Sequence, residues 1–488
     1  MKLLFVIPRN KSLFGDKGMT AHPHIGVAYL CSYLKEHNVD IEIFDDGLEG
    51  GLKRLDYIID DFKPQLIGIT IFSYCYSYAY NLIKRIREKT NTPIVAGGPH
   101  ICAIGKKILE DAKIEFAVKQ EGEFTLLELL NEFQKNYPDF SGIKGLIWKN
   151  KDGGIWENPD RELIADLDSL PFPDYDSFGL QKYPCYKQKT LPLITSRGCP
   201  FGCNYCSVRL SMGQRFRARS AENVYLELKT LYERGFNSFD INDDCFTLDE
   251  KRASDICGLI IENNLDIRFQ LYNGIRVDTV TPDLLKKMKR AGCYFISYGC
   301  EAGNDKVLKA IKKGISLKQV RSAVACANAA GIHNSVNFII GHKEETYRDA
   351  LDTLNFADEL PTNFVNFYNL LPYPGTESLE WAKQYAHFLV PPDSFLENIS
   401  YRDNKPVFET KEFTKVQREE IIRRGFDLYR KKILNFRLGK VLGPIIYWIT
   451  RNNFINKFST NFALTNPLGR FIYLRLSRKS FTTKEGAA

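Results

Sequence analysis

Three cysteines lie close together in the segment SRGCPFGCNYCSV, residues 196–208. Cys199, Cys203 and Cys206 have the spacing C-x3-C-x2-C. A structural zinc site normally takes four ligands, and a disulfide framework takes an even number of cysteines in an oxidising compartment. Thiolates are also the ligands of iron–sulfur clusters. Three thiols therefore predict a metal centre that keeps one coordination position open. A zinc site with a distant fourth cysteine is the alternative.

The local sequence also predicts where these thiols lie. The run LPLITSRG, residues 191–198, is expected to form a strand, and a helix is expected after the cysteines. The thiols would then occupy a loop at the carboxyl end of a strand, where barrel enzymes place their chemistry. Arg197 and Arg209 would favour the thiolate form. The other cysteines are expected to be small buried side chains: Cys31, Cys75, Cys102, Cys185, Cys245, Cys257, Cys293, Cys300 and Cys326.

Alternating strands and helices are expected to position this loop. In residues 1–138 the expected strands are 2–8, 40–46, 64–72, 92–100 and 114–120, and the expected helices are 25–37, 55–62, 80–90, 106–112 and 123–133. Such alternation is typical of a parallel sheet that is covered on both faces. We therefore predict an α/β fold that begins with a Rossmann-like, doubly wound sheet. Its ligands would bind at the carboxyl ends of the strands.

The rest of the chain divides into three further regions. Residues 139–188 are predicted to be a linker with a small hairpin around 152–154. Residues 189–400 contain about six strand–helix units, which predict a partial (β/α)6 barrel. Residues 401–488 are expected to be basic and mostly helical.

The composition restricts the class of protein. The chain has 488 residues, with 44% hydrophobic and 26% charged residues, which is ordinary for a globular protein. No apolar run is long enough to predict a membrane span, and the N-terminal segment MKLLFVIPRNKS does not resemble a signal peptide. Together with twelve cysteines, these features predict a cytoplasmic protein with reduced thiols.

The net charge of +8 is concentrated at the C-terminal end. Residues 431–488 contain eleven Lys and Arg residues and a single acid, Glu485. The segments 440–451 and 466–480 also combine apolar and basic residues. Three interpretations stay open. The apolar side chains could pack on the barrel under solvated charges, or the region could contact an anionic membrane peripherally. A nucleic-acid contact is the least favoured.

The cysteine spacing, with Tyr205 directly before the last cysteine, is the signature of the radical S-adenosylmethionine (radical SAM) family, and the sequence is identified as a member. The resemblance implies that Cys199, Cys203 and Cys206 hold a catalytic [4Fe–4S] cluster whose open iron binds SAM, close to Tyr205. One electron would cleave SAM to a 5′-deoxyadenosyl radical, which abstracts hydrogen from an unactivated carbon. The cofactor supplies this chemistry and the protein positions it.

Two further segments resemble motifs of this family at strand ends. SFDINDDCFT, residues 238–247, resembles the second-strand motif, so Asp243 and Asp244 are candidates to hold the amino group of SAM. The same two acids could equally cap a helix. YGCEAGND, residues 298–305, resembles the fourth-strand motif, which implies that Glu301 contacts the ribose or the amino-acid end of SAM.

The resemblance continues to the last strands of the barrel. NFIIGHKEET, residues 337–346, resembles the fifth-strand motif, often G-x-P-G-E-T, which implies that Gly341 lies near the adenine of SAM. Here His342 and Lys343 depart from the family pattern, so the details of this turn differ. LPYPGTE, residues 371–377, resembles the sixth-strand segment of the same branch.

The N-terminal region resembles cobalamin-binding domains in four segments that occur in the same order, 23–46, 67–74, 95–100 and 119–129. None of the seven histidines lies in the pattern D-x-H-x-x-G, whose histidine ligates cobalt. The resemblance therefore implies cobalamin without a protein histidine ligand, and His100 is expected beside the cofactor or at the surface. The implied contacts are in the strand-end loops: Gly68, Ile71, Phe72, Ser73, Gly97, Gly98, Pro99 and His100. The glycines would allow the backbone to approach a bulky ligand, although Gly97-Gly98 could also form an ordinary turn.

Together the two resemblances imply a cobalamin-dependent radical SAM enzyme. The leading expectation is methyl transfer from methylcobalamin to an unactivated carbon of a small metabolite, with a hydrophobic molecule or lipid suggested by the tail. An electron donor such as flavodoxin or ferredoxin is implied as a partner. The alternatives are an anaerobic oxidative cyclase or ring-rearranging enzyme of the tetrapyrrole type, a tRNA methylthiotransferase, which is less favoured, and a non-catalytic cobalamin or redox sensor.

Overall fold

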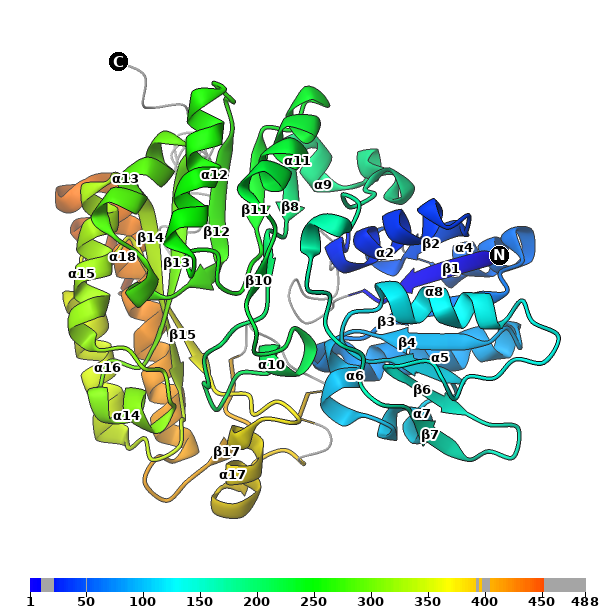
Figure 1. The fold of residues 1–488 in the computed structure, drawn as a ribbon. Coiled ribbons are helices and arrows are strands. Elements are labelled where there is room, and N and C mark those ends of the chain that lie inside the picture. The colour runs from blue at the N-terminus through cyan, green and yellow to red at the C-terminus, as the bar shows by residue number, and fades with distance from the viewer. Residues whose placement is uncertain (10–21, 50, 392–394, 397–403, 452–488) are drawn as a thin grey trace, which may run out of the picture.

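In the computed structural model of the chain, the described residues are 1–9, 22–49, 51–391, 395–396 and 404–451. They form two α/β units that lie side by side, with short segments between them (Figure 1). The strand–helix alternation that the sequence predicts is present in both units.

The first unit is built on a seven-stranded sheet in the order β2-β1-β3-β4-β5-β6-β7. Its strands are β1 (Lys2–Ile7), β2 (Asp40–Asp45), β3 (Leu66–Thr70), β4 (Ile94–Gly97), β5 (Phe116–Val118), β6 (Leu146–Lys149) and β7 (Ile155–Glu157). The strands β1 to β5 are parallel, and their order is that of a doubly wound sheet. The predicted Rossmann-like sheet is confirmed.

Side-chain alternation along β1 explains why helices cover both faces of this sheet. Leu3 and Phe5 pack in one core with helices α2 and α8, whereas Leu4 and Val6 pack in the opposite core with α4 and α5. The helices of the unit are α2 (Ile25–Glu36), α3 (Asp46–Glu49), α4 (Leu52–Phe62), α5 (Tyr76–Lys89), α6 (Pro99–Ile104), α7 (Lys107–Asp111) and α8 (Glu123–Glu132).

The hairpin that the sequence predicts around 152–154 is formed by β6 and β7. It does not stand in a separate linker, because β6 pairs antiparallel with β5 and extends the first sheet. Leu146 and Ile147 of β6 are buried in the two opposite cores. The first unit therefore continues past residue 138, where the sequence analysis placed its end.

The second unit has six parallel strands whose order in the sheet follows the chain, β8-β11-β12-β13-β14-β15. The strands are β8 (Thr190–Leu193), β11 (Ser238–Ile241), β12 (Arg268–Ile275), β13 (Cys293–Glu301), β14 (His333–Ile340) and β15 (Phe364–Asn369). The helices are α11 (Ala221–Glu233), α12 (Glu250–Glu262), α13 (Pro282–Arg290), α14 (Asp305–Ala310), α15 (Leu317–Ala329) and α16 (Tyr347–Glu359). The predicted partial (β/α)6 barrel is confirmed.

Each long helix of the barrel begins at a side chain that caps its first turn. The capping residues accept a hydrogen bond from a backbone N–H of the helix: Ser220, Asp249, Thr281, Ser316 and Thr346. Ser316 and Thr346 also form reciprocal capping boxes.

Short elements lie between the two units or follow the last strand of the barrel. They are α9 (Pro184–Gln188), β9 (Ser196–Arg197), α10 (Val208–Ser211), β10 (Arg217–Ala218), α17 (Glu377–Tyr385), β16 (His387–Phe388) and β17 (Phe408–Glu409). Figure 1 shows α10 between the barrel and the first unit, next to α6. The loop with the three cysteines therefore lies at the boundary between the two units.

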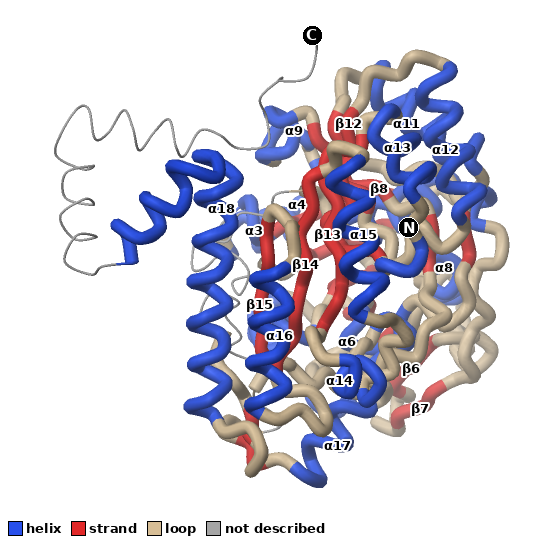
Figure 2. Tube along the Cα trace, turned by 90° about the vertical axis from the view of Figure 1, so that its left-hand side faces the viewer, coloured by secondary structure: helices blue, strands red, loops and turns tan. Residues whose placement is uncertain are grey.

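The C-terminal element is α18 (Lys415–Arg451), which packs along β15 and α16. Figure 2 shows α15, α16 and α18 on the outer face of the barrel strands. Gly439 has φ 82°, which interrupts the helix, and the segment after it turns away from the body (Figure 2). The segment 466–480 lies outside the described residues. In the described part of the chain, no helix is both long and apolar enough to cross a membrane.

Candidate active site

The loop with the three cysteines is held by backbone contacts at both ends. Gly198 has φ 88°, and a side chain there would place Cβ 2.3 Å from the carbonyl oxygen of Arg215. Only glycine fits this close approach. The Cys199 N–H donates to the carbonyl of Gly213 over 3.2 Å, and the Cys206 N–H donates to the carbonyl of Cys203 over 3.2 Å. The loop position is therefore set by its own backbone.

Cys199, Cys203 and Cys206 line one cavity of about 360 Å³. The carboxyl ends of the barrel strands supply the other walls: Asp244, Cys245, Asn273, Arg276, Glu301, Asn337 and Tyr368. In the described part of the chain, no three His, Cys, Asp or Glu side chains converge as they would around a single metal ion. Each cysteine of a [4Fe–4S] cluster binds a different iron, so such a cluster needs thiols spread around one cavity. Cys199, Cys203 and Cys206 all line this one cavity, so the donor set fits a cluster.

Hydrogen bonding and nearby cations favour a thiolate in this cavity. The Cys245 S–H donates to the Cys199 sulfur, and with Arg276 and Lys313 nearby it lowers the pKa of Cys199 to about 6. Burial raises the pKa of Cys206 to about 11. Arg197 and Arg209 were both expected to supply positive charge to the thiols. Arg209 lines the cavity, whereas the expectation for Arg197 was wrong. The Arg197 side chain binds two carboxylates of the first unit instead.

The two adjacent acids of the second-strand motif have different environments. The Asp243 carboxylate accepts hydrogen bonds from the Thr195 N–H over 2.6 Å, the Thr195 hydroxyl over 2.5 Å and the Ser196 hydroxyl over 2.6 Å. It therefore holds the strand that leads to the cysteines, and it does not line the cavity. Asp244 does line the cavity, and burial together with the Asp243 charge raises its pKa to about 7. Neither acid caps a helix, because Asp249 caps α12.

Glu301 and Tyr205 lie together on the cavity wall. Glu301 has φ 75°, and its carboxylate accepts a hydrogen bond from the Lys313 ammonium over 2.9 Å. Lys313 also lies 3.4 Å from the Tyr205 hydroxyl. A Cβ at Gly299 would lie 2.5 Å from the Glu301 carboxylate, so a side chain there would displace that carboxylate from its present position.

Gly341 directly follows β14 and does not line this cavity. It has φ 99°, and a Cβ there would lie 2.3 Å from the Arg418 guanidinium of α18. The backbone N–H groups of Gly341 and His342 donate to the Glu345 carboxylate over 2.6 and 2.9 Å. The turn that departs from the family pattern is thus fixed by Glu345 and covered by Arg418.

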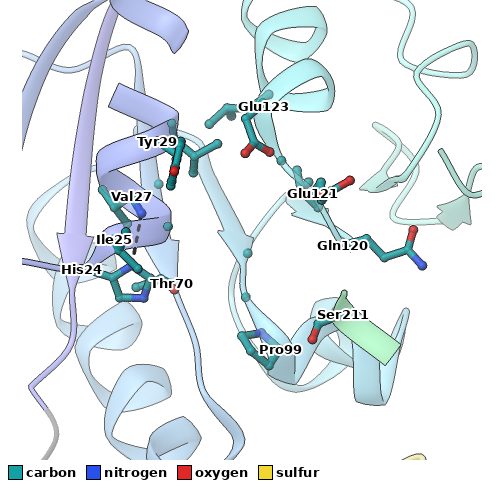
Figure 3. Close-up of a pocket in the computed structure, with 18 of the residues that line it drawn as sticks. His24, Ile25, Val27, Tyr29, Thr70, Pro99, Gln120, Glu121, Glu123 and Ser211 are labelled. Atoms are coloured by element: carbon teal, nitrogen blue, oxygen red, sulfur yellow. Dashed lines mark hydrogen bonds between the residues drawn. The ribbon is translucent and has the colours of Figure 1, made fainter. Parts of the chain in front are cut away.

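A second cavity of about 310 Å³ lies at the carboxyl ends of the first sheet (Figure 3). Of the residues expected to contact cobalamin, five line it: Gly68, Phe72, Gly97, Gly98 and Pro99. A Cβ at Gly97 would meet no atom within 4 Å, so this glycine leaves room for a ligand. Gly98 has φ 103°, and its Cβ would lie 2.8 Å from the Ile71 carbonyl oxygen. The strand-end glycines fit a bulky cofactor.

The other three expected contacts lie behind the cavity wall. Ile71 is fully buried in the core. His100 is also buried, its Nδ1 lies 3.1 Å from the Ser73 hydroxyl, and its Nε2 lies 3.3 Å from the Tyr80 hydroxyl. Burial lowers the pKa of His100 to about 4, so the ring is neutral near pH 7. Both ring nitrogens of His100 are engaged within the first unit.

His24 lines the cavity at the start of α2 (Figure 3). Its Nδ1 accepts a hydrogen bond from the Val27 N–H over 3.1 Å and caps the helix. Burial lowers the pKa of His24 to about 4. When the Nδ1 of a neutral imidazole accepts a hydrogen bond, the ring carries its proton on Nε2. In this arrangement His24 has no nitrogen lone pair to offer to cobalt.

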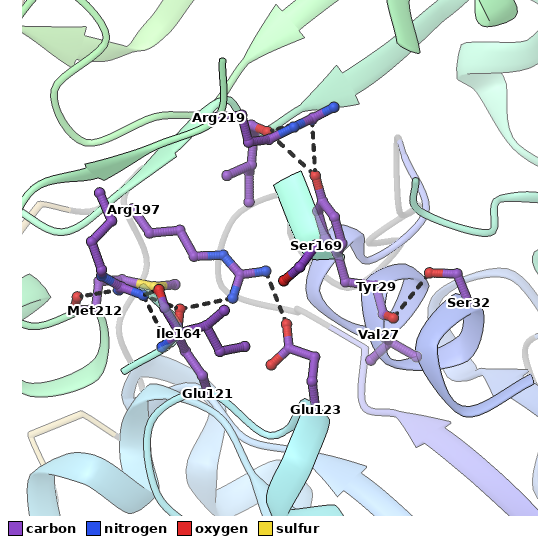
Figure 4. A network of polar contacts seen from close by, with 12 residues as sticks. Val27, Tyr29, Ser32, Glu121, Glu123, Ile164, Ser169, Arg197, Met212 and Arg219 are labelled. Atoms are coloured by element: carbon purple, nitrogen blue, oxygen red, sulfur yellow. Dashed lines mark hydrogen bonds and ion pairs between the residues drawn. The ribbon is translucent and has the colours of Figure 1, made fainter. Parts of the chain in front are cut away.

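A buried network of charges joins the two units (Figure 4). The Arg197 guanidinium donates to Glu121 over 2.8 Å and to Glu123 over 2.9 Å. Arg217, which pairs with Arg197 across β9 and β10, also donates to Glu121 over 2.8 Å. The Arg197 guanidinium lies over the Tyr29 ring, 5.2 Å from its centre. Because Glu121, Glu123 and Arg197 also line the second cavity, the network forms part of its wall.

Several residues of these two cavities could not be recognised from the sequence. Cys245 follows β11, Arg276 follows β12, and Lys313 lies between α14 and α15; no local pattern marks them. Glu121 and Glu123 lie inside the quoted segment 119–129, but their role depends on arginines more than 70 residues away in the chain.

Both units of the chain match known protein families, and one relative matches nearly the whole chain. The family described as the radical SAM superfamily matches residues 193–357, and the B12 binding domain matches residues 15–130. An uncharacterized methyltransferase of Pyrococcus horikoshii, PH0819, is 34% identical over 441 residues, which cover 89% of this chain and 94% of the relative.

Two more distant relatives have named activities. Cytidylyl-2-hydroxyethylphosphonate methyltransferase of Streptomyces wedmorensis is 25% identical and covers 82% of this chain and 85% of its own. Anaerobic magnesium-protoporphyrin IX monomethyl ester cyclase of Rubrivivax gelatinosus is 27% identical and covers 77% of this chain and 68% of its own.

Two solved structures share the fold. The cobalamin-dependent radical enzyme OxsB, with aqua-cobalamin and S-adenosylmethionine bound, has a TM-score of 0.71 at 17% identity and covers 98% of this chain and 75% of its own. The radical methyltransferase TsrM of Kitasatospora setae has a TM-score of 0.66 at 20% identity and covers 78% of this chain and 76% of its own.

Proposed function

Because the chain belongs to the radical SAM enzymes that carry a B12-binding domain, we propose that it transfers a methyl group from cobalamin to an unactivated carbon of a small metabolite. When bound, the cluster would supply the electron that cleaves SAM, and cobalamin would carry the methyl group.

The observation that carries this proposal is the shared wall between the two cavities. The single-turn helix α10 begins at Val208, two residues after Cys206. Val208 and Arg209 at its start line the cysteine cavity, whereas Ser211 at its end lines the cavity of the first sheet. A methyl donor and a hydrogen-abstracting centre must reach the same substrate, and cavities separated by one helical turn meet that requirement.

The cysteine cavity offers specific groups for the cluster and for SAM. Cys199, Cys203 and Cys206 would ligate the cluster. The Asp244 carboxyl, which faces the cavity, would bind the ammonium group of SAM, and that cation would favour the ionised carboxylate. Glu301, held by Lys313, would accept from a SAM hydroxyl or ammonium, with Tyr205 on the same wall.

The other residues predicted from the sequence would either support the SAM site or belong to the cobalamin site. Asp243 and Gly341 would support the SAM site, because Asp243 holds the strand before the cysteines and Gly341 allows Arg418 to pack against the turn. Gly68, Phe72, Gly97, Gly98 and Pro99 would contact cobalamin, with Ile71, Ser73 and His100 fixing the loops from behind.

Product analysis under anaerobic conditions tests the proposal. The reconstituted chain, with SAM, a reductant and cobalamin, should give a methylated product together with S-adenosylhomocysteine and 5′-deoxyadenosine. Candidate substrates would come from small molecules that co-purify without oxygen. Deoxyadenosine without S-adenosylhomocysteine would contradict methyl transfer and favour the cyclase alternative, to which a named relative belongs. No deoxyadenosine at all would favour a sensor.

We further propose that a flavodoxin or ferredoxin donates the electron. Reduced flavodoxin should replace dithionite in the SAM cleavage assay. If SAM is cleaved with dithionite but not with reduced flavodoxin or ferredoxin, the proposed electron donor is contradicted.

The C-terminal helix supports a peripheral membrane contact as a second part of the proposal. After Gly439, four large apolar side chains of α18 are exposed: Val441 by 75%, Leu442 by 57%, Ile445 by 49% and Trp448 by 71%. Basic residues accompany them in 431–488. An exposed apolar face with adjacent cations fits the surface of an anionic bilayer.

Liposome flotation tests this contact. Replacing the four apolar residues by serine should abolish co-flotation with anionic vesicles. The matched control replaces exposed aromatic residues of the first unit, Tyr57→Ser and Trp156→Ser, and should float like the unchanged chain. Equal flotation of all three proteins would contradict the proposal.

A further inference from the structure

A fourth cysteine lies in the cysteine cavity, outside the C-x3-C-x2-C motif. Cys245 follows Asp243 and Asp244 after β11 and is 4% exposed. It lines the same cavity as the three motif cysteines. Its S–H donates to the Cys199 sulfur, with 3.5 Å between the two sulfur atoms. This contact lies within the range for a hydrogen bond that involves sulfur.

The chain fixes this contact from both sides. On one side, the Cys199 N–H is bound to the Gly213 carbonyl. On the other side, the Leu248 N–H donates to the Cys245 carbonyl over 3.1 Å, and the neighbouring Phe246 is fully buried. Asp243, two residues before Cys245, is hydrogen-bonded to Thr195, four residues before Cys199. The two sulfurs are therefore brought together by the surrounding backbone.

A hydrogen bond to a cluster-ligating thiolate has a known electronic direction. Reduction of the cluster adds negative charge, and part of that charge lies on the cysteine sulfurs. A donor aimed at one of these sulfurs stabilises the reduced state more than the oxidised state and raises the reduction potential. The thiol is a weak donor, but Cys245 itself is only 4% exposed, so little water competes for its S–H.

We propose that Cys245 is a positioning residue that donates its S–H to the Cys199 ligand and raises the reduction potential of the cluster. This inference rests on the proposed cluster site. Cys245 would then affect the cluster without being one of its three ligands, and the fourth iron would stay open for SAM.

The experiment compares three variants of the full, reconstituted chain. Cys245→Ala removes the donor, and Cys245→Ser keeps a donor of similar size. Cys257→Ala is the matched control, because Cys257 is fully buried on α12 and does not line the cavity. The readouts are iron and sulfide content and the midpoint potential of the cluster from a redox titration followed by electron paramagnetic resonance.

We expect all variants to hold the same iron content as the unchanged chain. The midpoint potential should become more negative in Cys245→Ala, while Cys245→Ser should recover most of the shift and Cys257→Ala should show none. A merely structural role would not give this recovery by serine.

Three results would overturn the inference. An unchanged potential in Cys245→Ala would show that the hydrogen bond has no electronic effect. Loss of iron in both Cys245 variants would make Cys245 a ligand and not a donor. A shift of the same size in all three variants would reflect general loosening of the barrel. An unchanged chain that takes up no cluster would overturn the proposed function as well, whereas the first three results leave that function standing.

Discussion

The buried charges between the two units make a quantitative prediction. Glu121, Arg197 and Arg217 are buried, and the buried Glu123 completes a set of two acids and two bases with no net charge. We consider the change Glu121→Ala. It removes the carboxylate that both guanidiniums share and that also accepts the Ile164 N–H over 2.7 Å.

The loss in the free energy of unfolding follows from the contacts that the two arginines keep in Glu121→Ala. Arg197 keeps Glu123, but Arg217 keeps only the carbonyls of Ile164 and Met212. One buried positive charge is then uncompensated, and breaking a buried pair in this way costs about 3–5 kcal/mol. The exposed pair of Arg161 and Glu128, with Glu128 46% exposed, should contribute no more than about 1 kcal/mol.

The charge balance gives a sharper test than the single variant. Arg217→Met in the Glu121→Ala background restores a neutral set, so the double variant should be more stable than Glu121→Ala alone. Urea unfolding monitored by tryptophan fluorescence measures the free energies, with Glu128→Ala as the surface control. A cost below about 1 kcal/mol for Glu121→Ala, or a double variant that is less stable than the single one, would refute the reasoning.

Three further predictions concern the two cavities and the turn after β14. Gly97→Leu should abolish cobalamin binding, measured by absorption spectroscopy, while the thermal unfolding midpoint stays close to that of the unchanged chain, because a Cβ there meets nothing within 4 Å. Replacing Cys199 by alanine should abolish SAM cleavage and spare cobalamin binding; loss of both would contradict the separation of the cavities. Burial raises the pKa of Glu345 to about 7 from 4.5, so its protonated form contributes stability that is present below pH 4.5 and is lost as the pH rises through 7. That loss of stability amounts to about 3 kcal/mol. Glu345→Gln should remove this pH dependence. A variant whose stability still falls by the full amount between pH 5 and 8 would contradict the assignment of the loss to Glu345.

Short-range patterns in the sequence were sufficient to predict much of the fold. The alternation of Leu3 and Phe5 with Leu4 and Val6 is a local property, and it already implies a strand that is buried on both faces. The spacing of Cys199, Cys203 and Cys206 is local as well, since all three belong to one loop after one strand. The hairpin at 152–154 was also predicted, but its pairing with β5 depends on a strand about thirty residues away.

The sequence by itself determined the cluster loop, the two sheets and the class of chemistry, because these follow from residue types at fixed short separations. Only the tertiary structure decided which of Asp243 and Asp244 faces the cavity, and it turned Arg197 toward Glu121 and away from the thiols. It also placed Cys245 against Cys199, although the sequence suggested nothing more than a small buried residue. The physical reason is that these contacts join segments 46 to 76 residues apart, whose meeting depends on sheet register and on the packing of one unit against the other.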